Sequence, residues 1–357
     1  MTIDSELLRT APKVSLHDHL DGGVRPGTVL ELSAAIGHPL PASTAEALAD
    51  WFHEAASSGS LVRYLTTFEH TLAVMQTAAG LHRIAREYVA DLAADGVVYG
   101  ETRWAPEQHL REGLTVQAAV DAVRQGLADG MADAEASGHQ ITVRQLLTSL
   151  RTSSPSTATA QLTLANRHAG VAGFDLAGAE NGFPPSLFRD SFELLGEAGV
   201  PFTIHAGEAA GPDSMRDALD CGAHRLGHGV RIIDDIEIAA DGAASLGELA
   251  STILDRGVVL EMCPSSNVQT AAVGSLAEHP LRLLDGLGFR VTVNCDNRLM
   301  SRTTLTHEFE LLANAFDYTL PDVRRLTLNA AAGVFASAEQ RAELIERVES
   351  AFDALGS

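Results

Sequence analysis

Residues 12–22 read PKVSLHDHLDG, a short apolar run that ends in two histidines one residue apart. The segment from Lys13 to Leu16 predicts a β-strand, on which residues i and i+2 point to the same face. His17 and His19 would therefore project together from the end of this strand. Two converging imidazoles form half of a site for a divalent metal ion. An isolated pair of this kind also occurs at surface and capping positions, so the rest of the chain decides between the two interpretations.

Eight short apolar segments, the first among them, predict β-strands. They occupy residues 13–20, 97–104, 140–148, 171–177, 201–207, 224–230, 257–263 and 290–296. Most of them precede a stretch with helical spacing, and such alternation with β-branched strands indicates a parallel sheet. Eight strand–helix units predict an α/β fold, a closed (β/α)8 barrel of the TIM type, with an open doubly wound sheet as the main alternative.

The connection after the first strand is too long for one crossover helix. Within residues 26–94, apolar side chains recur at helical spacing in two patterns. The patterns are Leu61, Tyr64, Leu65, Phe68 and Leu72, and then Leu81, Ile84, Ala85, Tyr88, Val89 and Leu92. This helical insert would either cover the C-terminal mouth of a barrel or pack against its flank. The polar segments 153–157 and 240–246 look like short connections and not linkers, so residues 1–357 are predicted to form a single domain.

Composition limits the partners and the compartment. The 357 residues include 25 Lys and Arg against 47 Asp and Glu, a net charge of −22, which argues against nucleic acid or an anionic membrane as a partner. Cys221, Cys263 and Cys295 show no C-x-x-C spacing, which favours a reducing cytoplasm. The N-terminus lacks the features of a signal peptide, and no apolar run is long enough to span a membrane. Nothing in the sequence indicates the oligomeric state.

Polar residues with metal-binding or acid–base chemistry follow four of the predicted strands. They are His17, His19 and Asp21 after the first, His205 and Glu208 after the fifth, His228 in the sixth, and Asp296 in the last. In a barrel, all four strand ends meet at the C-terminal rim, where such folds build their active sites.

Three imidazoles and one carboxylate suit Zn²⁺ and leave a position open for water. The ligands would be His17, His19, His205 and Asp296. Bound zinc lowers the pKa of water to about 7. Glu208 and His228 then remain for the acid and the base, because a buried carboxylic acid can protonate a substrate and a histidine can orient and deprotonate the nucleophile.

Each of these residues also has an ordinary structural explanation. His205 alone would be a core histidine, and Glu208 a carboxylate at a helix N-terminus. His228 would occupy a tight turn, and Asp296 would cap a helix. All four explanations would have to coincide at four strand ends, so the combined pattern favours a metal-dependent hydrolase.

Seven segments of the chain resemble, in order, the adenosine deaminase family of metal-dependent amidohydrolases. They are PKVSLHDHLDG (12–22), VVYGETRWAPEQH (97–109), GFDLAGAE (173–180), TIHAGE (203–208), RLGHGV (225–230), EMCPSSN (261–267) and VNCDN (293–297). The resemblance implies a (β/α)8 barrel with extra helices over its mouth. It also implies the zinc-dependent hydrolytic deamination of adenosine to inosine and ammonia, with 2′-deoxyadenosine as a second substrate and one Zn²⁺ per chain.

The resemblance also implies individual roles. Glu208 would protonate purine N1, His228 would assist the water that attacks C6, and Asp296 would hydrogen-bond that water besides binding zinc. The substrate contacts would be His19, Asp21, Gly178 and Asn297. Within this set, Gly178 would donate its N–H to purine N3. Asp21 would accept from a ribose hydroxyl, and Asp at this position is typical of members that act on adenosine.

Two positions depart from the family pattern. Asn297 stands where many members have a second Asp, but an Asn amide can donate directly to purine N7, whereas Asp must carry a proton to do so. Cys295 stands where Thr is expected, and we interpret it as a small packing residue, with a reactive thiol as the alternative.

Two other functions stay open at this point. The same chemistry could act on another 6-aminopurine or a modified adenine nucleoside, a choice that residues 26–94 would make. A non-catalytic, metal-binding barrel is a more remote possibility.

Overall fold

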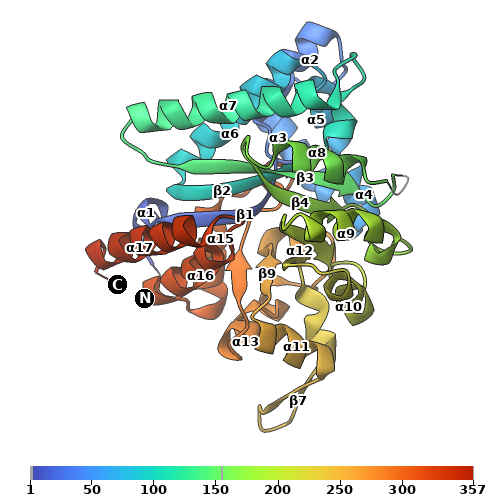
Figure 1. The fold of residues 1–357 in the computed structure, drawn as a ribbon. Coiled ribbons are helices and arrows are strands. Elements are labelled where there is room, and N and C mark those ends of the chain that lie inside the picture. The colour runs from blue at the N-terminus through green and yellow to red at the C-terminus, as the bar shows by residue number, and fades with distance from the viewer. Residues whose placement is uncertain (1–2, 154–155, 357) are drawn as a thin grey trace.

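The computed structural model describes residues 3–153 and 156–356, and its centre is a parallel sheet (Figure 1). The strands of this sheet are β1 (Lys13–His19), β2 (Val97–Trp104), β3 (Thr142–Leu150), β4 (Val171–Ala177), β5 (Phe202–Ala206), β6 (Arg225–His228), β9 (Val259–Met262) and β10 (Val291–Val293). They follow one another in chain order and pair in parallel throughout. The predicted TIM-type barrel is confirmed, and the open doubly wound alternative is wrong.

The barrel closes between its first and last strands through a few contacts. Asp18 and Asp296 form an isolated parallel bridge. The amide of His19 donates to the carbonyl of Asp296 at 2.7 Å, and the amide of Asp296 donates to the carbonyl of His17 at 2.9 Å. One step earlier, the side-chain oxygen of Asn294 accepts from two backbone amides of β1 at 3.0 and 3.1 Å. This seam therefore coincides with the segments that carry the predicted metal ligands.

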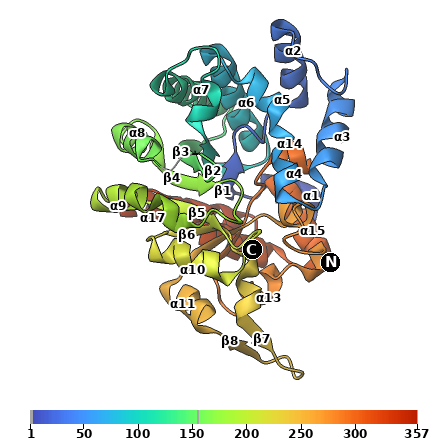
Figure 2. The ribbon, with the colours of Figure 1, turned by 90° about the vertical axis from the view of Figure 1, so that its right-hand side faces the viewer.

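Helices surround the barrel, as Figure 2 shows for α7, α8, α9, α10 and α11. The helices outside the insert are α1 (Ser5–Thr10), α7 (Val116–Ala136), α8 (Ala158–Asn166), α9 (Arg189–Glu197), α10 (Pro212–Asp220), α11 (Glu248–Arg256), α12 (Pro264–Gln269), α13 (Leu281–Gly286), α14 (Arg298–Ser301), α15 (Leu305–Phe316), α16 (Leu320–Gly333) and α17 (Ala338–Ala354). Short 3₁₀ helices span Pro106–His109, Pro185–Phe188, Val230–Asp235 and Leu276–Glu278. Apolar side chains of the strands and of the inner helix faces form one buried core.

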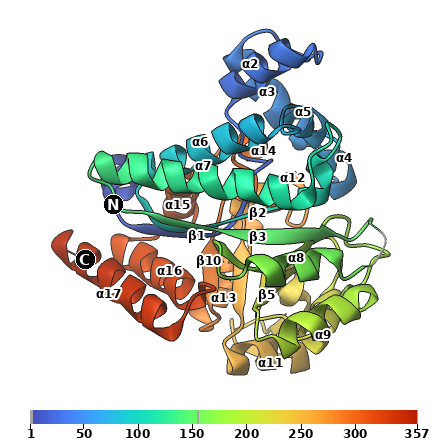
Figure 3. The same ribbon diagram turned by 45° about the horizontal axis from the view of Figure 1, so that its top comes forward.

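The helices of the insert, residues 26–94, occupy different positions relative to the barrel. It contains α2 (Pro26–Ile36), α3 (Ala45–Ala56), α4 (Leu61–Leu65), α5 (Phe68–Val74) and α6 (Ala78–Ala94). The apolar pattern from Leu61 to Leu72 lines a cavity at the mouth, but the chain turns at Thr66 and Thr67, so it forms two helices and not one. Helix α6 packs against α7 and β2 as a barrel helix. Helices α2 and α3 lie farther out, at the top of Figure 3. Covering the mouth and packing on the flank both occur, in different segments.

The segment 240–246 is not a simple connection. Strands β7 (Ile236–Ile238) and β8 (Ala244–Leu246) pair antiparallel and project from the barrel at the bottom of Figure 1. Asp241-Gly242 lies in the turn, and Gly242 has a φ of +86°, which explains why this dipeptide closes a hairpin. Of the predicted loop 153–157, residues 154 and 155 lie outside the described part of the chain. No helix in the described part is both long and apolar enough to cross a membrane.

Candidate metal centre and active site

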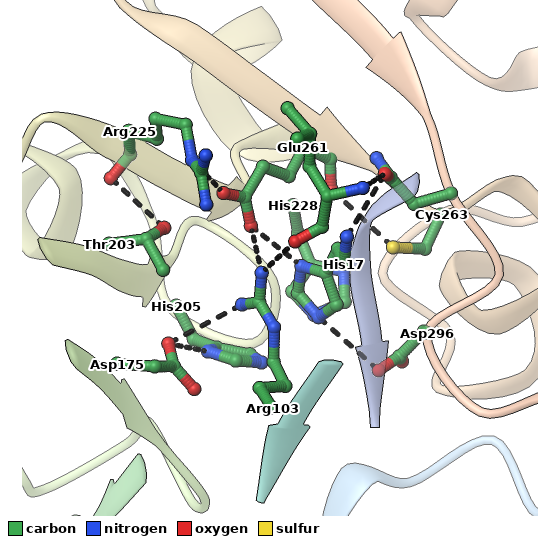
Figure 4. Close-up of polar contacts among 12 residues, drawn as sticks. His17, Arg103, Asp175, Thr203, His205, Arg225, His228, Glu261, Cys263 and Asp296 are labelled. Atoms are coloured by element: carbon green, nitrogen blue, oxygen red, sulfur yellow. Dashed lines mark hydrogen bonds and ion pairs between the residues drawn. The ribbon is translucent and has the colours of Figure 1, made fainter. Parts of the chain in front are cut away.

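The four predicted metal ligands converge at the C-terminal rim of the barrel. One potential ligand atom from each of His17, His19, His205 and Asp296 lies within 4.8 Å of all the others. The Nε2 atoms of His19 and His205 are 3.3 Å apart. One carboxylate oxygen of Asp296 lies 3.3 Å from Nε2 of both His17 and His19. Figure 4 shows the side chains of His17, His205 and Asp296 around this point.

The hydrogen bonds of the histidines fit a metal ion at this point. Nδ1 of His17 faces the Glu261 carboxylate at 3.0 Å, and Nδ1 of His205 faces Asp175 at 3.0 Å. A carboxylate can only accept, so both Nδ1 atoms carry a proton, and in the neutral form of each imidazole the Nε2 lone pair points into the cluster. Within the described residues, the buried Nε2 of His17 has no hydrogen-bond partner. An unsatisfied buried polar atom costs about 1–3 kcal/mol, a cost that a bound metal ion would remove. Burial also lowers the pKa of His19, which favours the neutral ligand form.

A buried network of charges holds these histidines in place (Figure 4). Glu261 accepts from Arg103 at 2.8 Å and from Arg225 at 2.6 Å, in addition to His17. Burial raises the pKa of Glu261, but the two guanidinium groups outweigh it and hold this pKa well below its usual range. Arg103 also reaches Asp175 at 3.4 Å, and Arg225 reaches Glu101 at 2.6 Å. The carboxylates that orient two of the candidate metal ligands are thus joined through one arginine.

Asp296 and His228 both have left-handed backbone conformations, with φ of +59° and +64°. Such angles are uncommon outside glycine and occur at functional sites that the surroundings enforce. Ser266 donates to the second carboxylate oxygen of Asp296 at 2.6 Å. Nε2 of His228 lies 3.5 Å from the Glu208 carboxyl group, and Asn267 lies 3.0 Å from its Nδ1. The two candidate proton-transfer groups therefore face each other beside the metal cluster.

Glu208 has the environment of a carboxylic acid that keeps its proton. It is 5% exposed, and its Oε1 atom has no hydrogen-bond partner among the described residues. Burial, and then the negative charges of Asp296 and Glu180, raise the pKa of Glu208 well above its usual value. Glu180 accepts from the consecutive backbone amides of residues 207–210 at 2.7–3.1 Å. It therefore fixes the loop that carries Glu208.

A cavity of about 220 Å³ adjoins the candidate metal site. The predicted site residues that line it are His19, Asp21, Gly178, His205, Glu208, His228, Asp296 and Asn297, and only His17 lies beneath its floor. Burial raises the pKa of Asp21 to about 7. A Cβ atom on Gly22 would lie 1.8 Å from Oδ1 of Asn297, so only glycine at this position leaves room for that amide. Helices α4 and α5 supply the apolar wall opposite the polar groups.

The model that describes the adenosine deaminase family matches residues 12–351. The chain belongs to the adenosine deaminase family. An adenosine deaminase of Mycobacteroides abscessus is 53% identical over 352 residues, which cover 98% of this chain and 97% of that relative. The family prediction made from the sequence motifs is confirmed.

Two solved structures extend this family likeness to the fold. A zinc-bound amidohydrolase from Burkholderia ambifaria has a TM-score of 0.87 at 26% identity, covering 100% of this chain and 95% of its own. An adenine deaminase from Arthrobacter aurescens has a TM-score of 0.81 at 28% identity, covering 95% of this chain and 98% of its own.

Sequence reasoning missed the residues that support the candidate site. They are Glu101, Arg103, Asp175, Glu180, Arg225, Glu261, Ser266 and Asn267. All of them lie inside the family motifs quoted above, and several place a charge within an otherwise apolar strand. Charged residues are rarely buried, so a charge within a buried strand was the signal that could have identified these supporting residues.

Proposed function

We propose that this protein catalyses the metal-dependent hydrolytic deamination of adenosine and 2′-deoxyadenosine to inosine or deoxyinosine and ammonia. The observation that carries the proposal is Glu208, a buried carboxyl group with a raised pKa that faces His228 beside a cluster of three histidines and one aspartate. Membership in the adenosine deaminase family supports the reaction, and the name of the relative from Mycobacteroides abscessus supports the substrate.

We infer one zinc ion per chain, held by His17, His19, His205 and Asp296. Three neutral imidazoles and one carboxylate are a donor set that zinc prefers, and the relative from Burkholderia ambifaria contains zinc. When bound, zinc supplies a Lewis acid that lowers the pKa of water from 15.7 to about 7.

The side chains around the cluster then have separate roles in the reaction. Glu208 donates its proton to purine N1, which draws electrons from C6 and makes that carbon accept a nucleophile. His228 and Asp296 hold the attacking water at C6. As the C6–oxygen bond forms and the C6–nitrogen bond breaks, one proton of the water leaves with ammonia and the other restores the acid form of Glu208.

The substrate contacts are proposed from the polar groups of the cavity. His19 lies at its floor, Asp21 would accept from a ribose hydroxyl, and the N–H of Gly178 would donate to N3. The amide of Asn297 would donate to N7, since the N–H₂ group of Asn donates without a change of protonation.

We also propose that residues 1–357 form one domain and that the protein is cytoplasmic. A single core surrounds the barrel, and Cys221, Cys263 and Cys295 are all free and buried, which suits a reducing compartment.

Ultraviolet assays on the purified, zinc-loaded protein test the reaction and the substrate class together. The panel contains adenosine, 2′-deoxyadenosine, adenine, AMP and modified adenine nucleosides. We expect turnover of adenosine and 2′-deoxyadenosine and little of adenine or AMP. Activity only on another 6-aminopurine would keep the chemistry and reject the substrate, whereas zinc binding without any turnover would reject the enzymatic function.

A further inference from the structure

A chain of hydrogen bonds with a fixed direction leads from the backbone to His228. It begins at Leu281, whose amide donates to Nδ1 of His279 at 3.1 Å. A backbone N–H can only donate, so this Nδ1 accepts. Burial lowers the pKa of His279 to about 4, so the imidazole is neutral at neutral pH and carries its proton on Nε2.

The next member is Asn267, whose amide orientation is determined by two independent donors. Its Oδ1 accepts from Nε2 of His279 at 3.2 Å and from the backbone amide of Cys263 at 3.2 Å. Its Nδ2 group is left to point at Nδ1 of His228, 3.0 Å away. Asn267 is fully buried, as are its partners, so these side chains and amides settle its orientation.

An Asn N–H₂ group can only donate, so Nδ1 of His228 must accept. This excludes both the imidazolium form and the tautomer with a proton on Nδ1. Neutral His228 then carries its proton on Nε2, the atom that lies 3.5 Å from the Glu208 carboxyl group. We propose that Asn267 is a positioning residue that fixes His228 as an Nε2–H donor, which orients the attacking water and does not take its proton.

This inference rests on the proposed deamination and completes its proton path. A base needs a free lone pair, and Nε2 of His228 has none in this tautomer. Once Glu208 has given its proton to N1, its carboxylate is the acceptor beside His228. It takes one proton from the water as the C6–oxygen bond forms, and it returns that proton to the amino group as the C6–nitrogen bond breaks. The remaining hydroxyl proton, released as the C6 carbonyl forms, restores the acid form of Glu208.

Long-range ¹H–¹⁵N correlation spectra of the imidazoles in the zinc-loaded protein test the assignment without any substrate. His228→Gln identifies the resonances of His228 by their loss. We expect a protonated Nε2 and an unprotonated Nδ1 in the wild type. In Asn267→Asp, the carboxylate only accepts, so the proton should move to Nδ1. A wild type with a proton on Nδ1, or on both nitrogens, would overturn the proposal.

Kinetics of the same variants test the role. A wrong histidine tautomer costs up to about 10⁴-fold in a Ser-His-Asp hydrolase, and we expect kcat of Asn267→Asp to fall at least ~10-fold with little change in KM. Asn329→Asp is the matched control, because Asn329 in α16 also donates from Nδ2, to the carbonyl of Val291 at the start of β10, at 3.1 Å. It should leave the tautomer and kcat unchanged. If the tautomer of His228 shifts in Asn267→Asp but kcat stays normal, the positioning role of Asn267 in catalysis is rejected.

Two precautions keep the test decisive. If Asn267→Asp does not fold, Asn267→Ala removes the donor and should produce a mixture of tautomers, while an unchanged single tautomer would contradict the proposal. If the wild type proves inactive on every purine, the proposed function fails, but the spectra still decide the tautomer.

Discussion

Glu208 can act as an acid only while it holds its proton, and its surroundings are arranged to keep it protonated. The raised pKa has a direct consequence for Glu208→Gln, because the amide has the same shape but no acidic proton. We expect kcat to fall about 10²–10⁴-fold, while zinc content and inosine binding stay near those of the wild type. Glu107→Gln is the control, since within the described residues Glu107 accepts from Ser153 at 2.7 Å. Near-normal turnover by Glu208→Gln would remove this residue from the mechanism.

The two residues that depart from the family pattern are explained to different extents. Cys295 is buried, and burial raises the pKa of its thiol well above the usual value, which supports its interpretation as a packing residue. Asn297 lines the cavity, yet its dependence on the space left by Gly22 was invisible in the sequence. Residue types could be predicted from motifs, but the direction of a hydrogen bond depends on partners from other elements. The orientation of Asn267 shows this, because it is set by Cys263 and His279.

At the level of loops, Glu180 connects the segment after β4 to the segment after β5. Its negative charge also helps to raise the pKa of Glu208, together with Asp296, and His228 faces the same carboxyl group. Glu180→Gln removes that charge, so the pKa of Glu208 should fall. Because the proposed mechanism uses the protonated form of Glu208, the alkaline limb of the kcat profile should move to lower pH.

Asp217→Asn is a matched control for this variant. Asp217 also joins the same two regions, since it accepts from the backbone amide of Ser186 at 2.8 Å, but it does not contact Glu208. Its pH profile should match that of the wild type. An unshifted profile in Glu180→Gln would mean that Glu180 only shapes the loop.

The secondary structure was largely predictable because the strands are apolar runs between polar breaks. The exceptions have physical reasons. Strands β7 and β8 have three residues each, too few to show an alternating pattern. The apolar spacing from Leu61 to Leu72 is continuous, and nothing in it shows that the chain turns at Thr66. Turns within a periodic pattern depend on what the two helices pack against.

Across the whole molecule, buried charged pairs join the strands of the barrel next to the candidate metal site. Arg103, Asp175 and Glu261 join β2, β4 and β9 and hold two histidine ligands. Metal affinity should therefore depend on residues that never touch the metal. Changes of this kind cost about 10–100-fold in affinity.

Asp175→Asn tests this dependence, because it removes the charge that holds His205. We expect the Kd for zinc to rise about 10–100-fold, and the thermal stabilisation by a fixed excess of zinc to shrink accordingly. Asp129→Asn is the control, since Asp129 forms a similar pair with His82 at 2.8 Å on the surface. Equal zinc affinity in both variants would show that the buried network does not support the ligands.

The way in which the barrel closes affects how the metal-free protein moves at the junction between β1 and β10. Strands β1 and β10 touch through few backbone hydrogen bonds, and a metal ion held by His19 on one side and Asp296 on the other would span that junction. The amide of His19 donates to the carbonyl of Asp296, so its exchange with deuterium reports whether the two ends of the sheet stay together. Chelation should speed this exchange more than that of amides between β3 and β4. A single proton in the backbone would then report metal occupancy before any nucleoside is added.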